Sequence, residues 1–289
     1  MNAMLTSAVA GLAAGGAYAL LGVCTIFTYR LVAVVNFTGA ASGAVGTFAS
    51  IALIEAGFPV AIAVGAGILA GALVGLAIGM VMTSWFFEAR AQTKAAVTVA
   101  LLVGMVALGL RLTGGQHPHQ FRELVPGSVL RLAGVEITAA AALTIALAAC
   151  LTAAAELLLR QTRFGLRLRA LSERPMAAEL IGIPVRFLSL AVWTVTGAIT
   201  SFALMIIAPQ RSPDFMSLSL LVVPALAAAL VGSFESFWMA ALGGLAIGVI
   251  EGAASDLTSL SQYRGAVPFL VILSVLMWSQ RGARWDEAR

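Results

Sequence analysis

Acidic and amide side chains inside long apolar stretches are the residues of this sequence best suited to chemistry. Glu251 lies between Ile250 and Gly252 in one such stretch, and Asn36 stands beside Phe37 near the start of another. A polar or ionisable group at membrane depth is costly, so each is a candidate for lining a solute path. The structural alternative is that Glu251 is a partnered carboxylate near the membrane surface and that Asn36 bonds a neighbouring helix.

Metal and enzyme chemistry have weaker support. His117 and His119 flank a proline, but two imidazoles without a nearby carboxylate or thiolate make a poor metal site, so we expect no metal. The sequence shows no pair of carboxylates within an apolar stretch and no nucleophile beside a base, which argues against an intramembrane enzyme. Glu55, Glu136 and Glu156 fall near the ends of apolar stretches, where solvation at the membrane surface accounts for them.

The composition indicates that this chain lies in a membrane. Of its 289 residues, 61% are apolar and 10% are charged, and the mean hydropathy is +1.00. Soluble proteins carry about 25% charged residues, so the water-soluble classes are excluded. Unbroken apolar runs, rather than alternating segments of about ten residues, favour helices over a membrane β-barrel. We therefore expect an all-α, polytopic transmembrane bundle, with residues 1–289 forming one domain.

Apolar runs between charged or proline-containing breaks predict nine spans, and eight is the alternative because two of the spans are weak. The span at 217–231 is short and contains Pro224, and only Tyr29-Arg30-Leu31 separates the first two spans. The expected spans lie near residues 5–28, 33–54, 60–86, 95–112, 136–159, 186–208, 217–231, 237–254 and 265–280.

The distribution of basic residues predicts the orientation. The net charge of +4 arises from residues scattered through the connectors, so the positive-inside rule explains it better than a nucleic-acid partner does. One side of the membrane would carry Arg30, Arg90, Lys94, Arg160, Arg163, Arg167, Arg169, Arg174, Arg186, Arg281, Arg284 and Arg289, and the other side Arg111, Arg122, Arg131, Arg211 and Arg264. We expect the richer side to be cytoplasmic, which places the N-terminus outside and the C-terminus inside.

Glycine recurs every fourth residue in two of the expected spans. The stripes consist of Gly67, Gly71, Gly75 and Gly79 in one span and of Gly244, Gly248 and Gly252 in the other. Lipid provides no hydrophobic drive for helix association, so close backbone approach along such stripes is expected to hold the bundle together. The functional alternative is a sliding surface or a narrow pore wall.

The connector at 160–186 predicts a short helix outside the membrane, near 172–182. Ser172 can cap its start, Pro175 is tolerated in its first turn, and Gly182 followed by a proline is a stop signal. One side of this helix would gather Met176, Ala177, Leu180 and Ile181. Such an apolar face fits either a groove on a partner protein or the bilayer surface, and the residues alone favour neither.

The sequence resembles the permease subunits of branched-chain amino acid type ABC importers (LivH/LivM-like), and the shorter subunit in particular. The similarity extends in order through nearly the whole chain. It rests on Gly16-Ala17-Tyr18-Ala19-Leu20, Asn36-Phe37, Thr162-Arg163-Phe164-Gly165, Arg169-Ala170, Glu173, Pro175, Ala177-Ala178, Leu180-Ile181-Gly182-Ile183, Gly243-Gly244, Gly248, Glu251 and Tyr263-Arg264.

The resemblance implies a multi-subunit importer in a bacterial-type plasma membrane. This chain would pair with a second, similar permease or with another copy of itself, with two cytoplasmic ATP-binding subunits and with an extracytoplasmic solute-binding protein. The helix near 172–182 would be the coupling helix that docks on the ATPase. The sequence contains no Gly-x-x-x-x-Gly-Lys-Ser/Thr phosphate loop, so the partners would bind ATP, and the chain would be a transport subunit without a cofactor rather than an enzyme.

The resemblance also assigns roles to residues. Tyr18, Asn36, Phe37 and Glu251 are expected to help line the substrate path. The residues expected to couple the permease to the ATPase are Arg163, Gly165, Arg169, Glu173, Pro175, Ala177, Ala178, Glu179, Leu180 and Gly182.

Two departures from the family pattern bear on the cargo. The family commonly continues its Asn-Phe pair with Ala-His-Gly, whereas Thr38-Gly39-Ala40 follows here, and Glu235 stands where glycine is usual. Branched-chain amino acids are therefore the default cargo, with amides, urea and aromatic acids as alternatives. An ion-coupled secondary carrier or channel is the rival function, for which Glu251 is the one well-placed intramembrane charge.

Overall fold

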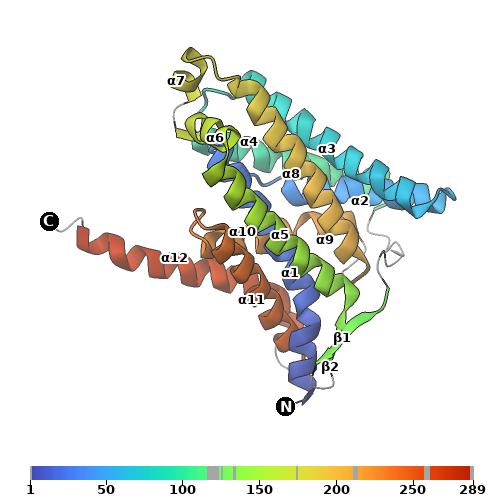
Figure 1. Ribbon diagram of the computed structural model, residues 1–289. Helices are drawn as coiled ribbons and strands as arrows, with labels where there is room; N and C mark the ends of the chain where they lie inside the picture. The colour runs from blue at the N-terminus through green and yellow to red at the C-terminus, as the bar shows by residue number, and fades with distance from the viewer. Residues whose placement is uncertain are drawn as a thin grey trace.

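A bundle of apolar α-helices makes up most of the computed structural model, which describes residues 2–115, 124, 126–132, 135–173, 175–210, 214–256 and 261–286 (Figure 1). The longer helices are α1 (Asn2–Val32), α2 (Gly39–Glu55), α3 (Val60–Trp85), α4 (Ala91–Leu112), α5 (Ala139–Gln161), α8 (Val185–Ile207), α11 (Phe237–Asp256) and α12 (Val267–Asp286). The shorter elements are β1 (Ser128–Leu132), β2 (Val135–Thr138), α6 (Arg163–Glu173), α7 (Pro175–Leu180), α9 (Phe215–Ser219), α10 (Val222–Val231) and the 3₁₀ turns Ala208–Gln210 and Ser261–Ala266.

The expected all-α membrane bundle is confirmed. Within the described residues, six helices are long and apolar enough to cross a membrane, and three shorter apolar segments, Gly39–Glu55, Phe215–Val231 and Tyr263–Ser279, accompany them. Each of the nine expected spans therefore has a helical counterpart. The weak span at 217–231 consists of two helices, α9 and α10, that meet at Leu220 and Leu221 just before Pro224.

The boundary expected between the first two spans is wrong. Tyr29-Arg30-Leu31 belongs to α1, since none of these residues breaks a helix, and the N–H of Ala33 still donates to the Tyr29 carbonyl at 2.9 Å. The second helix begins only at Gly39, so Asn36 and Phe37 lie in the connector rather than within a span. Ala33 marks the turn with a left-handed φ of 54°.

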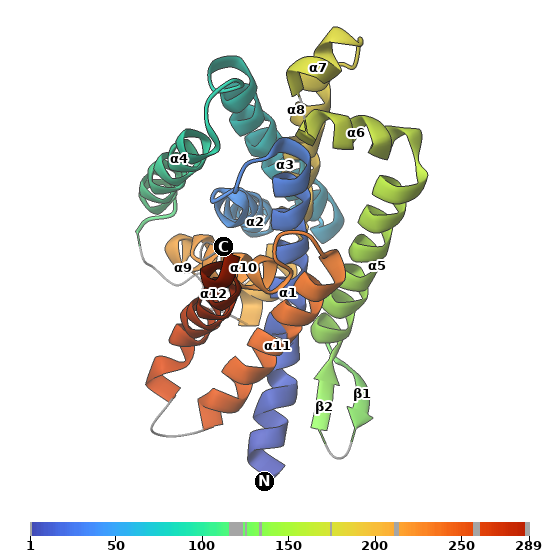
Figure 2. The same cartoon turned by 90° about the vertical axis from the view of Figure 1, so that its left-hand side faces the viewer.

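An antiparallel hairpin precedes α5, where the sequence analysis expected the helix to begin near 136. β1 pairs with β2, with Leu132 opposite Val135, and Gly127 enters the hairpin at a φ of 109°. The helix starts at Ala139 because Thr138 caps it, its Oγ1 accepting from the N–H of Ala141 at 3.2 Å. The hairpin and the start of α1 lie at one end of the bundle, and α6 and α7 lie at the opposite end (Figures 1 and 2).

The connector between α5 and α8 holds two helices rather than the single one expected near 172–182. Ser172 is not a cap but belongs to the last turn of α6, where its Oγ donates to the Arg169 carbonyl at 3.0 Å. α7 follows as a separate helix of six residues. Leu168, Leu171 and Ala178 are buried in the core that α1 and α5 share with the start of α8, which holds both short helices against the bundle.

Candidate functional site

A buried hydrogen bond joins two of the expected path residues. The hydroxyl of Tyr18 on α1 donates to Oε2 of Glu251 on α11 at 2.7 Å, and both side chains are buried. This arrangement satisfies a carboxylate that would otherwise be costly inside the bundle. The structural interpretation of Glu251, a partnered carboxylate, is therefore correct as far as its bonding is concerned.

Glycines set the distance between the two helices that carry this pair. A Cβ atom on Gly15 would lie within 3.0 Å of the Leu245 backbone, and one on Gly248 would overlap the backbone of Gly15. A Cβ on Gly11 would likewise overlap the carbonyl of Gly248 and lie 3.0 Å from the Cα of Gly252. The expected tight packing along the glycine stripe of α11 is thus confirmed, and its partner is a matching stripe on α1 that the sequence analysis did not identify.

The other glycine stripe, which lies on α3, packs this helix against α8. A Cβ on Gly71 would overlap Ser201, and one on Gly75 would overlap the carbonyl of Trp193, so the backbones of α3 and α8 touch. Gly197 on α8 is needed for the same reason, because a Cβ there would overlap the carbonyl of Gly71. The expected tight packing along the glycine stripe of α3 is confirmed as well.

Asn36 lines a small polar cavity between α1, the start of α2, α8 and α10. Its Oδ1 accepts from both the N–H and the hydroxyl of Thr38, at 2.9 and 2.7 Å, and so initiates α2. Its Nδ2 takes no hydrogen-bond partner within the described part of the chain. The cavity has a volume of about 10 Å³, which is room for a single water molecule.

Threonines from two helices supply the polarity of this cavity, and the sequence analysis missed them. Thr25 and Thr28 come from α1, and Thr196 and Thr200 come from α8. Each hydroxyl donates to a carbonyl of its own helix, which leaves its oxygen lone pairs available as hydrogen-bond acceptors. The signal that identifies them is spacing, because pairs three or four residues apart share one helix face.

The four expected path residues do not converge on one cavity. Phe37 packs in the same apolar core as Tyr18, whereas Tyr18 and Glu251 are not among the residues that line the cavity of Asn36. The pair lies along the α1–α11 contact, and Leu21, one turn after Tyr18 on α1, lines the cavity. α1 is thus the element that links the two groups.

A tight turn places α6 across the end of α5. A Cβ on Gly165 would overlap the carbonyl of Leu158, so only glycine fits there. Thr162 shapes the turn: its hydroxyl donates to the Leu158 carbonyl at 2.6 Å and accepts from the Gly165 N–H at 2.9 Å. The Thr-Arg-Phe-Gly motif therefore has a structural cause in this turn.

α7 ends in a left-handed turn and presents an apolar tip. Gly182 adopts a φ of 83°, and its N–H and that of Ile183 donate to the carbonyls of Glu179 and Ala178, each at 3.0 Å. Leu180 and Ile181 are 89% and 76% exposed, respectively. Arg163, Arg169, Glu173, Ala177 and Glu179 are also exposed on α6 and α7, whereas Gly165 and Ala178 are buried.

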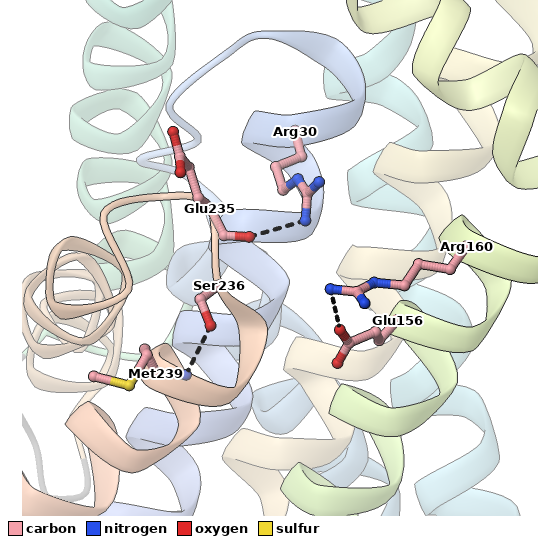
Figure 3. A network of polar contacts seen from close by, with 6 residues as sticks. All are labelled: Arg30, Glu156, Arg160, Glu235, Ser236 and Met239. Atoms are coloured by element: carbon pink, nitrogen blue, oxygen red, sulfur yellow. Dashed lines mark hydrogen bonds and ion pairs between the residues drawn. The ribbon is translucent and has the colours of Figure 1, made fainter.

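The end of the bundle that bears α6 and α7 is rich in arginine. A cavity there is lined by Arg30, Arg160 and Arg169 with Glu156 and Glu235, and Figure 3 shows the interactions at its edge. Nearby, Phe87 stacks under both Lys94 and Arg186, with their charged groups 6.0 and 5.8 Å from its ring centre. Five of the basic residues that the sequence analysis assigned to one side of the membrane therefore lie around these two sites: Arg30, Lys94, Arg160, Arg169 and Arg186.

The described residues hold no group of three or more potential metal ligands. His117 and His119, the weak metal candidate of the sequence, lie outside the described residues, as do Arg174 and Arg211.

The fold and these buried polar groups define a polytopic α-helical membrane protein with a cluster of arginines at one end. A family model of the permease component of branched-chain amino acid transport systems matches residues 7–276. The chain therefore belongs to the branched-chain amino acid transport permease family.

A curated relative agrees with this family. A probable branched-chain amino acid transport permease protein LivH from Methanocaldococcus jannaschii is 26% identical over 142 residues. The aligned region covers 46% of this chain and 45% of that relative, so the chain spans less than half of the relative's length.

Proposed function

We propose that this chain is the membrane permease subunit of an ATP-binding cassette importer for a small polar solute, with branched-chain amino acids as the default cargo. Family membership over residues 7–276 supports a transport permease. Its partners would be a second permease or another copy of itself, two cytoplasmic ATP-binding subunits and an extracytoplasmic solute-binding protein. ATP would be bound by the partners, and the chain would lie in a plasma membrane with its N-terminus outside.

The observation that carries the proposal is the exposed tip of α7. Leu180 and Ile181 project from a short helix that the buried Ala178 fixes to the bundle. Large apolar side chains on a helix outside the spans are suited to a groove on a partner protein. Rigid attachment matters for coupling, since a helix that is packed into the core transmits a displacement to α1, α5 and α8.

The proposed substrate path runs beside α1, through the polar cavity of Asn36. The Nδ2 donors of Asn36 and the hydroxyl lone pairs of Thr25, Thr28, Thr196 and Thr200 can replace the hydration of an ammonium or carboxylate group. The cavity joins helices from both halves of the chain, so a relative movement of α8 against α1 would open it. Alternating access requires such a change between two states, which ATP-driven movement of α7 would bias.

Reconstitution of the complete importer tests coupling. In liposomes that also contain the ATPase subunits and the loaded binding protein, replacing both Leu180 and Ile181 by serine is expected to reduce substrate-stimulated ATP hydrolysis at least about tenfold, since one buried apolar side chain contributes about 1.5–3 kcal/mol. The matched control is Leu112→Ser, at the exposed end of α4. Unchanged stimulated hydrolysis in the double variant would remove the assignment of α7.

The same liposomes distinguish the rival function. Uptake by this chain without any ATPase, with collapse of uptake when the ion gradient is dissipated, would establish an ion-coupled secondary carrier. Strict dependence on ATP and on the binding protein supports the importer.

A further inference from the structure

Three guanidinium groups surround the cavity at the basic end of the bundle. Arg30 comes from the end of α1, Arg160 from the end of α5 and Arg169 from α6, and Ser236 and Phe237 at the start of α11 complete the wall. The cavity has a volume of about 320 Å³, at the lower end of the range of small-molecule sites. It therefore has room for a small polar group such as phosphate.

The acidic residues at this cavity do not neutralise it. Glu156 is committed to Arg160, with 2.8 Å between its Oε1 and the guanidinium Nη2. Arg30 donates to the backbone carbonyl of Glu235 at 2.9 Å, and Figure 3 shows that the Glu235 carboxylate points away from this guanidinium. In the described part of the chain, neither Arg30 nor Arg169 forms an ion pair with a carboxylate.

Two of the three guanidinium groups, those of Arg30 and Arg160, have contacts that fix their positions. Arg30 stacks on the ring of Phe237, 5.3 Å from its centre, and its bond to Glu235 fixes its direction. Arg160 is held by the turn of α5 that carries Glu156, and Figure 3 shows both guanidinium groups directed into the space between α1 and α5. A guanidinium group held in this way can donate two parallel hydrogen bonds to the oxygens of a phosphate group.

We propose that this cavity, here named the arginine cavity, binds a phosphate group at the level of the membrane surface, and that its ligand is the headgroup of an anionic phospholipid or free inorganic phosphate. The cavity lies where α1 and α5 end, which is the depth of lipid headgroups if these helices span the bilayer. Basic pockets between membrane helices on the cytoplasmic side bind anionic headgroups by the same interaction. The proposal does not rest on the proposed function, because its test measures binding rather than import.

The test measures binding to the full-length purified chain in a neutral maltoside detergent, together with any subunits that co-purify. The two probes are short-chain phosphatidylglycerol and inorganic phosphate, and the readout is the dissociation constant. The double variant Arg30→Gln with Arg169→Gln is expected to bind phosphatidylglycerol about thirtyfold more weakly, because each basic residue contributes to headgroup binding. Arg169→Lys keeps the charge and is expected to retain most of the affinity.

Arg186→Gln is the matched control, since Arg186 lies at the same basic end but outside the arginine cavity. If the double variant fails to fold because the bond to Glu235 is lost, Arg169→Gln alone serves, with an expected loss of about fivefold. Saturable binding of phosphatidylglycerol that phosphate displaces assigns the lipid as ligand, and binding of phosphate alone assigns the free ion. Equal affinities in wild type and variants, or an equal loss in Arg186→Gln, would overturn the proposal.

Discussion

The bond between Tyr18 and Glu251 joins residues 233 positions apart and lies where two helix backbones touch. Its energy matters because a buried oxygen that loses its donor keeps the full cost of desolvation. Glu251 is also the acid that the ion-coupled rival would have to use. A carboxylate already bonded to a tyrosine serves first to hold α1 against α11.

The first prediction concerns this hydroxyl. Tyr18→Phe is expected to lower the free energy of unfolding by about 1–3 kcal/mol, since it leaves a buried acceptor without this donor. The measurement is thermal unfolding of the purified protein in detergent. Tyr29→Phe is the control, because Tyr29 is partly exposed and keeps its ring contact with Phe234 after the change. Equal melting temperatures of the Tyr18 variant and the control would show that the hydrogen bond between Tyr18 and Glu251 contributes no stability.

At the scale of residues, the sequence could identify Glu251 and Asn36 but not their partners. A charge or an amide in an apolar run is visible without a structure, because its cost at membrane depth is general. The partner of Glu251 depends on how α1 and α11 are aligned, which no local pattern specifies. Thr25 and Thr200 were missed for a related reason: their spacing from Thr28 and Thr196 indicates a shared helix face, but only the packing shows that this face borders a cavity.

Among the elements, the glycine contact between α1 and α11 gives the second prediction. Gly248→Ala would force the two backbones apart and is expected to cost about 1–3 kcal/mol of stability, as overpacking does. Gly104→Ala is the matched control, because a Cβ there meets nothing within 4 Å and alanine favours the helix. Thermal unfolding of both variants provides the comparison, and a stable Gly248 variant would contradict the close packing.

The turn after α7 gives the third prediction. Gly182→Ala places a side chain at a φ of 83°, which costs roughly 1–2 kcal/mol and disturbs the tip of α7. Substrate-stimulated ATP hydrolysis by the reconstituted importer is expected to fall, while insertion into the membrane is unaffected. Gly182→Asn should retain most of the activity, because asparagine tolerates this conformation. Equal activity of the alanine and asparagine variants would argue against a role for the turn.

The elements themselves were largely predictable, and the exceptions have local causes. Apolar length specifies a span almost by itself, so each expected span has a counterpart. The sequence predicts one helix near 172–182 and no helix at 163–171, because Ser172 is as acceptable inside a helix as at its start. The turn at Thr162, which Gly165 makes possible, lets α6 begin at Arg163. The hairpin was missed because its strands are short and adjoin a long apolar run.

For the whole molecule, the basic end predicts the orientation, which gives the fourth prediction. With Cys24 and Cys150 replaced by serine, a cysteine at Leu180 should react with an impermeant maleimide only from the cytoplasmic side, and one at the exposed Val129 of the hairpin only from outside. Intact cells and inverted vesicles provide the two sides. Labelling of the Leu180 position in intact cells would invert the topology and remove the proposed coupling to a cytoplasmic ATPase.

The contact between α1 and α11 also constrains how the protein is made. α1 enters the bilayer early in synthesis, yet Gly11, Gly15 and Tyr18 find their counterparts only on a helix translated more than 200 residues later. Until then, a bare glycine surface and an unbonded phenol face lipid or the translocation machinery. α5 and α8 can pack against α1 before α11 is made, but a ribosome that stalls before α11 leaves the glycine face of α1 uncovered. Quality-control proteases can recognise such an incomplete bundle.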